Sequence, residues 1–241
     1  MLNLLKIFTF TLVVGLMSAC SKSDDKPAAT LNDAQSAQLA KKNLQEKSAA
    51  AAPKGDKSTP LENYQELKSG NQIMFAALAV DTMPVDYEAV AKALSAKYRY
   101  ENDEFKKKDM LTQLKISIDD GIAKAKSNKY YYSEIDSQLE KYDFESKSFQ
   151  IPEFANSGQY RYFNDNSNYN YTYSNSSVFR KLIIKDESVA RTIEGLRSKY
   201  QALRIAVYLF ANNVEIGKPQ LNAEIIRVRI SDRKGNLLAE M

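Results

Sequence analysis

Tyrosines in the asparagine-rich stretch 160–174 are the side chains best suited to contact a ligand. Tyr169, Tyr171 and Tyr173 alternate with polar residues, so an extended strand places all three on one face. A tyrosine offers an apolar ring and a hydrogen-bonding tip, which suits a sugar ring or a peptide partner. The possible binding surface comprises five tyrosines: Tyr160, Tyr162, Tyr169, Tyr171 and Tyr173. The alternative interpretation is a long hairpin whose tyrosines cover its own sheet.

The same stretch has asparagines at the spacing of a calcium-binding loop, namely Asn164, Asn166 and Asn168. Tyr169 and Asn175 stand where such a loop needs a glycine and a bidentate glutamate. We therefore expect no calcium here, and the sequence predicts neither a metal nor a cofactor elsewhere.

Asp143 and Glu145 alternate with Tyr142 and Phe144 in a segment expected to be a strand. Alternation puts the two rings on the face that packs against helices and the two carboxylates in water. The other hypothesis is that the carboxylates act as an acid and base pair, which requires a second surface closing over them.

Arg227 and Arg229 share one face of an expected C-terminal strand. They could bind a carboxylate or phosphate through paired hydrogen bonds. Alternatively, their aliphatic stems cover a half-exposed sheet while the charged ends stay in water.

The composition removes most catalytic chemistries. The 241 residues include no histidine and one cysteine, Cys20. Serine–histidine and cysteine–histidine nucleophile pairs cannot form, nor can zinc sites built from these residues. We expect no catalytic residues and no enzymatic activity, with a carboxylate-based hydrolase as the remaining alternative.

The charge is balanced. After residue 19 the chain carries 33 basic and 30 acidic residues, and the basic ones are scattered along it. A nucleic-acid-binding protein usually concentrates positive charge, so we expect no nucleic acid partner.

Cys20 follows a segment with the layout of a secretory signal peptide. Lys6 precedes the apolar run 7–16, and Ser18 and Ala19 stand directly before the cysteine. The run is too short to span a membrane, which takes about 20 residues. The segment resembles a bacterial lipoprotein signal, and the alternative is an ordinary signal peptide followed by a free cysteine. In a lipoprotein the peptide is cut before the cysteine, which then carries acyl chains.

That resemblance implies a location. It makes residues 1–19 the signal peptide and Cys20 a lipid anchor, for which two or more acyl chains give stable membrane binding. Ser21 replaces the aspartate that favours retention in the inner membrane. We therefore expect the bacterial outer membrane, with the domain in the periplasm or exposed at the cell surface.

The chain divides by composition. Residues 20–58 are rich in alanine, lysine and serine and contain no aromatic residue. Such a segment buries too little apolar surface to offset its ordering entropy, so we predict a flexible tether. Residues 59–241 are long enough for a single domain with its own core.

Periodicity predicts the elements of this domain. Apolar residues at spacings of three and four indicate helices at 72–80, 86–98, 103–125 and 186–200. Alternating or β-branched runs indicate strands at 130–139, 142–151, 178–184, 204–216, 221–230 and 237–240. The order predicts an α+β fold, with N-terminal helices packed on a mostly antiparallel C-terminal sheet.

Two short motifs carry a further resemblance. They are Tyr100-Glu-Asn-Asp-Glu-Phe105 and Tyr142-Asp-Phe-Glu-x-x-x-Phe149. With them, residues 60–235 resemble a family of uncharacterised proteobacterial lipoproteins that carry a domain of unknown function. The resemblance implies a domain facing the cell envelope and supplies no catalytic or binding residues.

These observations favour a lipid-anchored envelope lipoprotein that serves as a non-enzymatic interaction or structural module. Its expected partners are the membrane, through the acyl chains on Cys20, and an unidentified envelope protein. The alternative is a module that binds glycan, such as peptidoglycan, through the tyrosine-rich hairpin.

Overall fold

The computed structural model describes residues 38–39, 42, 53–215 and 218–241. The chain forms two compact units, residues 1–41 and 42–241. In the first unit the described residues are Gln38 and Leu39, which are helical and exposed. The predicted signal peptide, Cys20 and most of the predicted tether lie outside the described residues.

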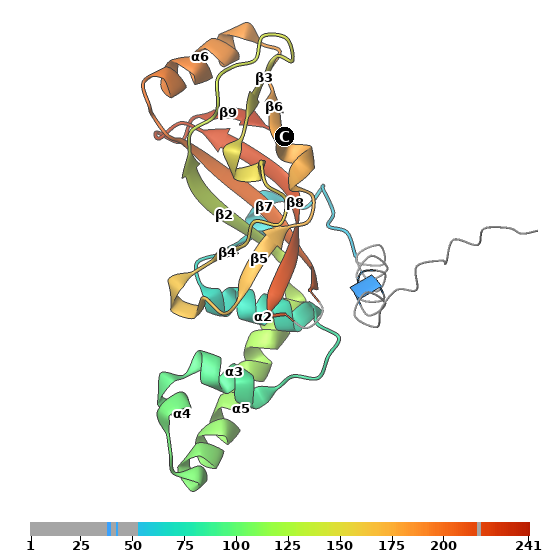
Figure 1. Ribbon diagram of the computed structural model, residues 1–241, viewed down its shortest axis with the longest axis vertical. Coiled ribbons are helices and arrows are strands. Elements are labelled where there is room, and N and C mark those ends of the chain that lie inside the picture. The colour runs from blue at the N-terminus through green and yellow to red at the C-terminus, as the bar shows by residue number, and fades with distance from the viewer. Residues whose placement is uncertain (1–37, 40–41, 43–52, 216–217) are drawn as a thin grey trace, which may run out of the picture. The chain divides into compact units, whose positions relative to one another are not determined.

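The second unit is built on a seven-stranded sheet with the order β1-β2-β7-β8-β5-β4, in which β9 also pairs with β8 (Figure 1). Its strands are β1 (Gln65–Glu66), β2 (Tyr130–Ser137), β4 (Arg161–Tyr162), β5 (Asn170–Tyr173), β7 (Leu203–Val214), β8 (Gln220–Ser231) and β9 (Leu237–Glu240). The β1–β2 and β5–β8 pairs are parallel and the other pairs are antiparallel. A separate antiparallel pair joins β3 (Ser148–Gln150) to β6 (Lys181–Ile183). The α+β prediction with a mostly antiparallel sheet is confirmed.

The helices fall close to their expected positions. They are α2 (Gly70–Val80), α3 (Tyr87–Leu94), α4 (Ala96–Tyr100), α5 (Glu104–Ser127) and α6 (Glu187–Ser198). Four short 3-10 turns are η1 (Leu61–Asn63), η2 (Pro152–Phe154), η3 (Asn164–Asn166) and η4 (Ser176–Phe179). Side-chain caps fix the helix starts: Asp103 and Asp186 accept backbone N–H groups of α5 and α6. Ser69 and Gln72 form a reciprocal capping box on α2. The expected helix 86–98 is split at Ser95, which ends α3 and caps α4.

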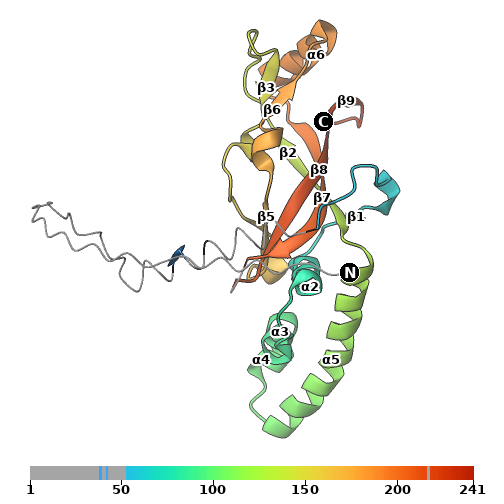
Figure 2. The same cartoon turned by 90° about the vertical axis from the view of Figure 1, so that its right-hand side faces the viewer.

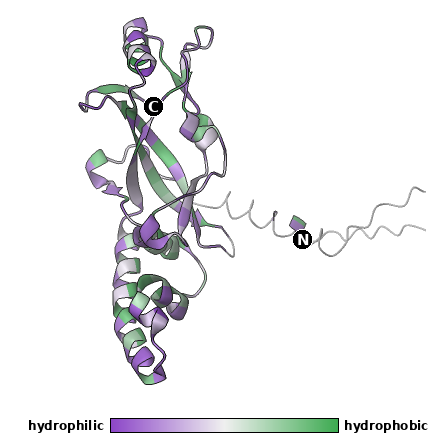
Figure 3. Cartoon of the chain, turned by 60° about the vertical axis from the view of Figure 1, so that its left-hand side comes forward, coloured by the Kyte–Doolittle hydropathy of each residue, from purple (hydrophilic) through white to green (hydrophobic). Residues whose placement is uncertain are grey.

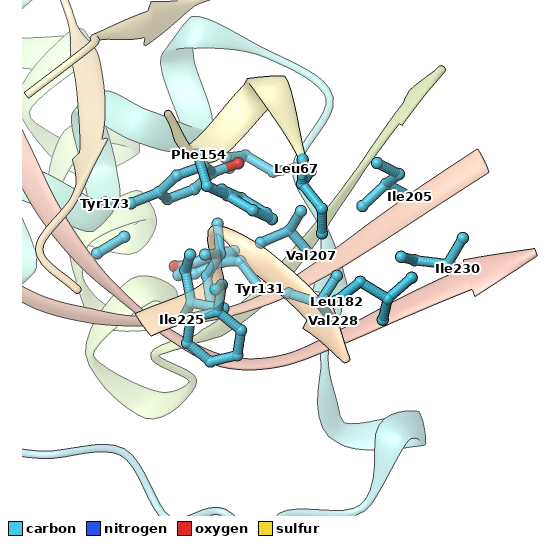
Figure 4. Close-up of a cluster of buried hydrophobic side chains, with 14 of the residues drawn as sticks. Leu67, Tyr131, Phe154, Tyr173, Leu182, Ile205, Val207, Ile225, Val228 and Ile230 are labelled. Atoms are coloured by element: carbon cyan, nitrogen blue, oxygen red, sulfur yellow. The ribbon is translucent and has the colours of Figure 1, made fainter. Parts of the chain in front are cut away.

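One face of the sheet, its inner face, holds the main core (Figure 4). Alternation along β7 and β8 sends Ile205, Val207, Val228 and Ile230 into it, and each is fully buried. Residues from α2, α6 and the β3–β6 pair close the other side of this core. Phe154 of η2 is fully buried among them.

A second, smaller core lies among α2, α3, α4 and α5 beyond the end of the sheet (Figures 1 and 2). We call α3, α4 and α5 the helical arm. The buried residues of this second core, the arm core, are Met74 of α2 together with Val90, Ala91, Tyr98, Ile118 and Ile122 of the arm. Figure 3 shows hydrophobic residues as stripes on helices that are otherwise polar. Consecutive residues of α2 serve the two cores, because Ile73 belongs to the main core and Met74 to the arm core.

The opposite, outer face of the sheet holds the last residues of the predicted tether. The Gly55 N–H donates to the Glu224 carboxylate at 3.0 Å, and the Asp56 N–H donates to the Tyr130 hydroxyl at 2.9 Å. A Cβ on Gly55 would lie 2.7 Å from Phe210 Cβ, which cannot swing aside as the end of a side chain can, so glycine suits this close approach. Residues 53–58 therefore belong to the folded unit, and the expectation of flexibility is corrected for these residues. Backbone groups pairing with the sheet supply the order that the side chains lack.

The expected strand 142–151 is another correction. Asp143 forms a single bridge to Ser148, and residues 144–147 make a turn in which Lys147 has φ 50°. The Asp143 carboxylate accepts N–H groups from Glu145 and Ser146 and holds that turn closed. Local hydrogen bonding by aspartate thus outweighs the alternating pattern.

Candidate binding surface

The structure separates the five tyrosines of the predicted surface. Tyr171 and Tyr173 are each 4% exposed in the main core. Tyr169 is half-buried and packs against both cores. Tyr160 and Tyr162 are 61% and 52% exposed. The prediction that Tyr169, Tyr171 and Tyr173 form an exposed surface is therefore wrong.

Pairing explains why the row faces inward. The three tyrosines do alternate as expected, but β5 pairs with β8 so that Tyr171 lies opposite Leu221 and Tyr173 opposite Ala223. Both partners belong to the main core, and residues directly opposite each other share a face. Burial raises the pKa of the Tyr173 hydroxyl far above its ordinary value. These two rings cover their own sheet, which was the alternative interpretation.

Arg161 fixes the edge strand that carries the exposed tyrosines. Its guanidinium lies 4.1 Å from the centre of the Tyr173 ring. It also donates to the backbone oxygen of Glu153 at 2.7 Å and lies 3.8 Å from the Glu153 carboxylate. Because neighbouring side chains on a strand alternate, this inward arginine turns Tyr160 and Tyr162 outward.

The two outward rings form what we call the tyrosine pair. The ring centres of Tyr160 and Tyr162 are 6.2 Å apart and the planes are tilted by 33°. They lie on and directly before β4, the edge strand of the sheet beside β5 (Figure 1). The pair is thus an exposed aromatic surface on a strand held in place from beneath.

Beside the tyrosine pair, polar side chains extend across the outer face of the sheet from β5 to β8 and β7. In register, Tyr162 lies opposite Asn170, which lies opposite Gln220. Two residues further along β5, Thr172 lies opposite Asn222 of β8, which lies opposite Asn213 of β7. We call the resulting set the polar row: Asn170, Thr172, Asn213, Gln220 and Asn222.

Side-chain hydrogen bonds tie this polar row together. The Gln220 amide donates to the Thr172 hydroxyl at 3.4 Å, and that hydroxyl donates to Asn222 Oδ1 at 3.0 Å. Asn222 Nδ2 donates to Asn213 Oδ1 at 2.8 Å. The side-chain oxygen of Asn170 is shielded from solvent and has no hydrogen-bond partner within the described part of the chain. The sequence signal for Asn170 and Thr172 was their alternation with tyrosine. Asn213 and Asn222 join the row only through strand register, which the sequence does not display.

The other charged candidates take structural roles. Arg227 and Arg229 lie 3.6 Å and 3.1 Å from the Glu240 carboxylate of β9. Asp143 lies in an exposed turn, where the Ser146 hydroxyl and backbone N–H groups keep the pKa of its carboxyl below the ordinary value. No second surface closes over Asp143 and Glu145 in the described residues. An exposed carboxyl with a lowered pKa stays ionised at neutral pH, so Asp143 does not suit the acid of an acid and base pair.

The asparagines that matched the calcium-loop spacing support a helix instead. Asp165 accepts the Gly70 N–H at the start of α2 at 2.8 Å. Asn166 is buried, and its Nδ2 donates to Asn71 Oδ1 at 3.0 Å. Over the described ranges, no group of three or more histidine, cysteine, aspartate or glutamate side chains could hold a metal ion.

A separate open pocket of about 400 Å³ lies between the 142–147 turn and α6. Phe144, which is 83% exposed, and Tyr142 form one wall, with Ala190 and Gly195 on the helix opposite. The expectation that Phe144 packs inward is therefore wrong. Its ring contacts Tyr142 edge to face, with the ring centres 5.1 Å apart.

Comparison with known proteins identified no protein similar to this chain. The chain matches no protein-family model, and no similar protein was found among curated proteins or solved structures. Within the described residues, none of the helices is long and apolar enough to cross a membrane.

Proposed function

We propose that this chain is a lipid-anchored protein of the bacterial outer membrane whose folded unit is a non-enzymatic interaction module facing the periplasm. The observation that carries the proposal is the order of the first 20 residues: Lys6, an apolar run, Ser18-Ala19 and then Cys20. The likeness to uncharacterised proteobacterial lipoproteins belongs to the same proposal.

The edge of the sheet at β4 supports the interaction role. β4 lies at the end of the strand order, and no described strand pairs with its outer side. An open edge can accept an extended segment of a partner by adding a strand. Tyr160 and Tyr162 stand on this edge and supply the aromatic anchors that protein interfaces favour.

Metabolic labelling tests the anchor. Cells expressing the chain are grown with radiolabelled palmitate, and wild type is compared with Cys20→Ser. We expect label in the wild type alone, together with outer-membrane fractionation that the variant loses. A Ser23→Ala variant serves as the control that keeps both. Unlabelled wild-type protein would contradict the proposal.

A second candidate function is binding to peptidoglycan through the tyrosine pair, which the exposure of both rings favours. The mature chain is mixed with isolated peptidoglycan sacculi and sedimented, beside a Tyr160→Ala, Tyr162→Ala variant. Tyr200→Ala is the matched control, because Tyr200 is 82% exposed and lies beyond the end of α6. If wild type and control pellet and the double variant does not, the glycan candidate is supported. Equal sedimentation of all three would contradict it.

A further inference from the structure

We propose that the tyrosine pair and the polar row together bind an uncharged polysaccharide across the outer face of β4, β5, β8 and β7. The inference rests on the glycan-binding candidate above and names its ligand class. It is carried by one juxtaposition: two exposed rings and five uncharged hydrogen-bonding side chains in register on neighbouring strands.

The tyrosine pair supplies the apolar contact. A sugar ring presents a face of C–H groups and a rim of hydroxyls, so it packs on an aromatic ring while its edge stays polar. Tyr160 and Tyr162 present two such rings 6.2 Å apart at the start of the row. The contacts of Arg161 hold the strand that carries them in place before any ligand arrives, which lowers the entropy cost of binding.

The polar row supplies matching hydrogen bonds. A side-chain amide carries both donors and acceptors, as a sugar hydroxyl does. Thr172, which is 4% exposed, organises its neighbours, while Asn170, Gln220 and Asn222 remain half-buried. Asn170 lies directly across from Tyr162, so its side-chain amide is the first of the row beside the tyrosine pair.

Charge decides the ligand class. The polar row contains no charged side chain, and the next outward residue of β8, Glu224, already accepts the Gly55 N–H. Lys218, just before β8, lies 2.6 Å from the Glu215 carboxylate. Over the described residues, the polar row offers no positive side chain to an anionic polymer, whereas an uncharged glycan needs none.

The extent of the surface fits a chain of sugars. Four adjacent strands at about 4.8 Å spacing cover about 14 Å from Tyr162 to Asn213. That length exceeds one sugar ring, so we expect a polymer to bind more tightly than a monosaccharide.

Affinity electrophoresis tests the inference. The mature lipidated chain in neutral detergent is run through native gels containing hydroxyethyl cellulose, dextran or galactomannan, and through gels containing anionic alginate. We expect retardation by at least one uncharged polymer and little by alginate. Tyr160→Ala with Tyr162→Ala should weaken that binding about tenfold or more.

Two variants locate the effect. Asn222→Leu removes the centre of the polar row, and it should weaken binding while thermal unfolding shows that the chain still folds. Tyr200→Ala, which removes a more exposed tyrosine elsewhere on the surface, should leave binding unchanged.

The outcomes separate this inference from the proposed function. Retardation by alginate alone, or by no polymer, overturns the inference, as does binding that survives in both the tyrosine and the Asn222 variants. Sedimentation with sacculi without retardation by uncharged polymers also overturns it and leaves the peptidoglycan candidate standing. Failure of palmitate labelling would overturn the anchor and leave the polysaccharide result intact.

Discussion

The sheet and the helical arm reach order by different means. In the main core, strands from the sheet meet α2, α6 and the β3–β6 pair, so side chains are enclosed from both sides. In the arm core, α3, α4 and α5 share six buried residues with α2, and a larger set of apolar residues is only partly buried. Helices that pack only against one another, with no sheet beneath them, cannot bury the whole apolar face of each helix. We therefore expect local opening of the arm to cost less free energy than global unfolding of the folded unit.

Removing a ring from the main core is expected to have the largest effect. Phe154 is fully buried, and its ring centre lies 5.6 Å from that of Tyr173. Phe154→Ala leaves a cavity and should lower the free energy of unfolding by about 3–5 kcal/mol. Urea unfolding followed by circular dichroism should show one transition at a lower midpoint. An unchanged midpoint would show that η2 does not contribute to the core.

A matched deletion in the arm is expected to act more locally. Tyr98 is 1% exposed at the centre of the arm core. Tyr98→Ala should cost about 2–3 kcal/mol, less than Phe154→Ala because the thin arm relaxes around the gap. Hydrogen exchange should speed up in α3, α4 and α5 while β7 and β8 keep their protection. Equal acceleration in all five elements would break the comparison, since it would make arm and sheet one cooperative unit.

The junction between the two regions offers a smaller change. Gly121 of α5 lies against the Phe75 ring of α2, and a Cβ there would approach the ring to 2.6 Å. Gly121→Ala should destabilise the protein by about 1–2 kcal/mol despite its better helix propensity. Thermal unfolding measures the loss, and Ala123→Gly, on an exposed position of the same helix, gives the propensity effect alone. A stabilised Gly121→Ala protein would show that Phe75 moves aside freely.

The titration of a single buried tyrosine of the sheet, Tyr131, should give the smallest effect. Burial raises the pKa of Tyr131 to about 12. The folded state therefore keeps a proton that the unfolded state loses above pH of about 10, and stability falls as pH rises from about 10 to 12. Near pH 11 this residue alone should remove about 1 kcal/mol. Tyr131→Phe should lessen the alkaline loss in urea unfolding, whereas Tyr100→Phe, at an exposed position of the arm, should not.

Much of the fold was predictable because local patterns coincided with tertiary packing. The helix starts at Asp103 and Asp186 and the two long strands β7 and β8 fall within a few residues of their expected positions. The turn after Asp143 was missed, because its carboxylate bonds compete with an alternating pattern that looks like a strand.

The candidate surface was predictable only in part. Alternation correctly placed Tyr171 and Tyr173 on one face, but alternation does not say which face meets the core. That choice depends on pairing with Leu221 and Ala223, about 50 residues further along the chain. The same long-range register brings Asn213 and Asn222 together, so no local pattern could reveal the polar row.

The attachment of Gly55 has a mechanical consequence. Its N–H donates to the Glu224 carboxylate of β8, and a Cβ added to Gly55 would lie 2.7 Å from Phe210 Cβ of β7. Tension arriving along the chain from its N-terminal side would therefore enter the two longest strands at the middle of the sheet. If Cys20 carries the proposed anchor, such tension would load the β7–β8 pair, which is paired from Arg204 to Val214, before the edges of the sheet.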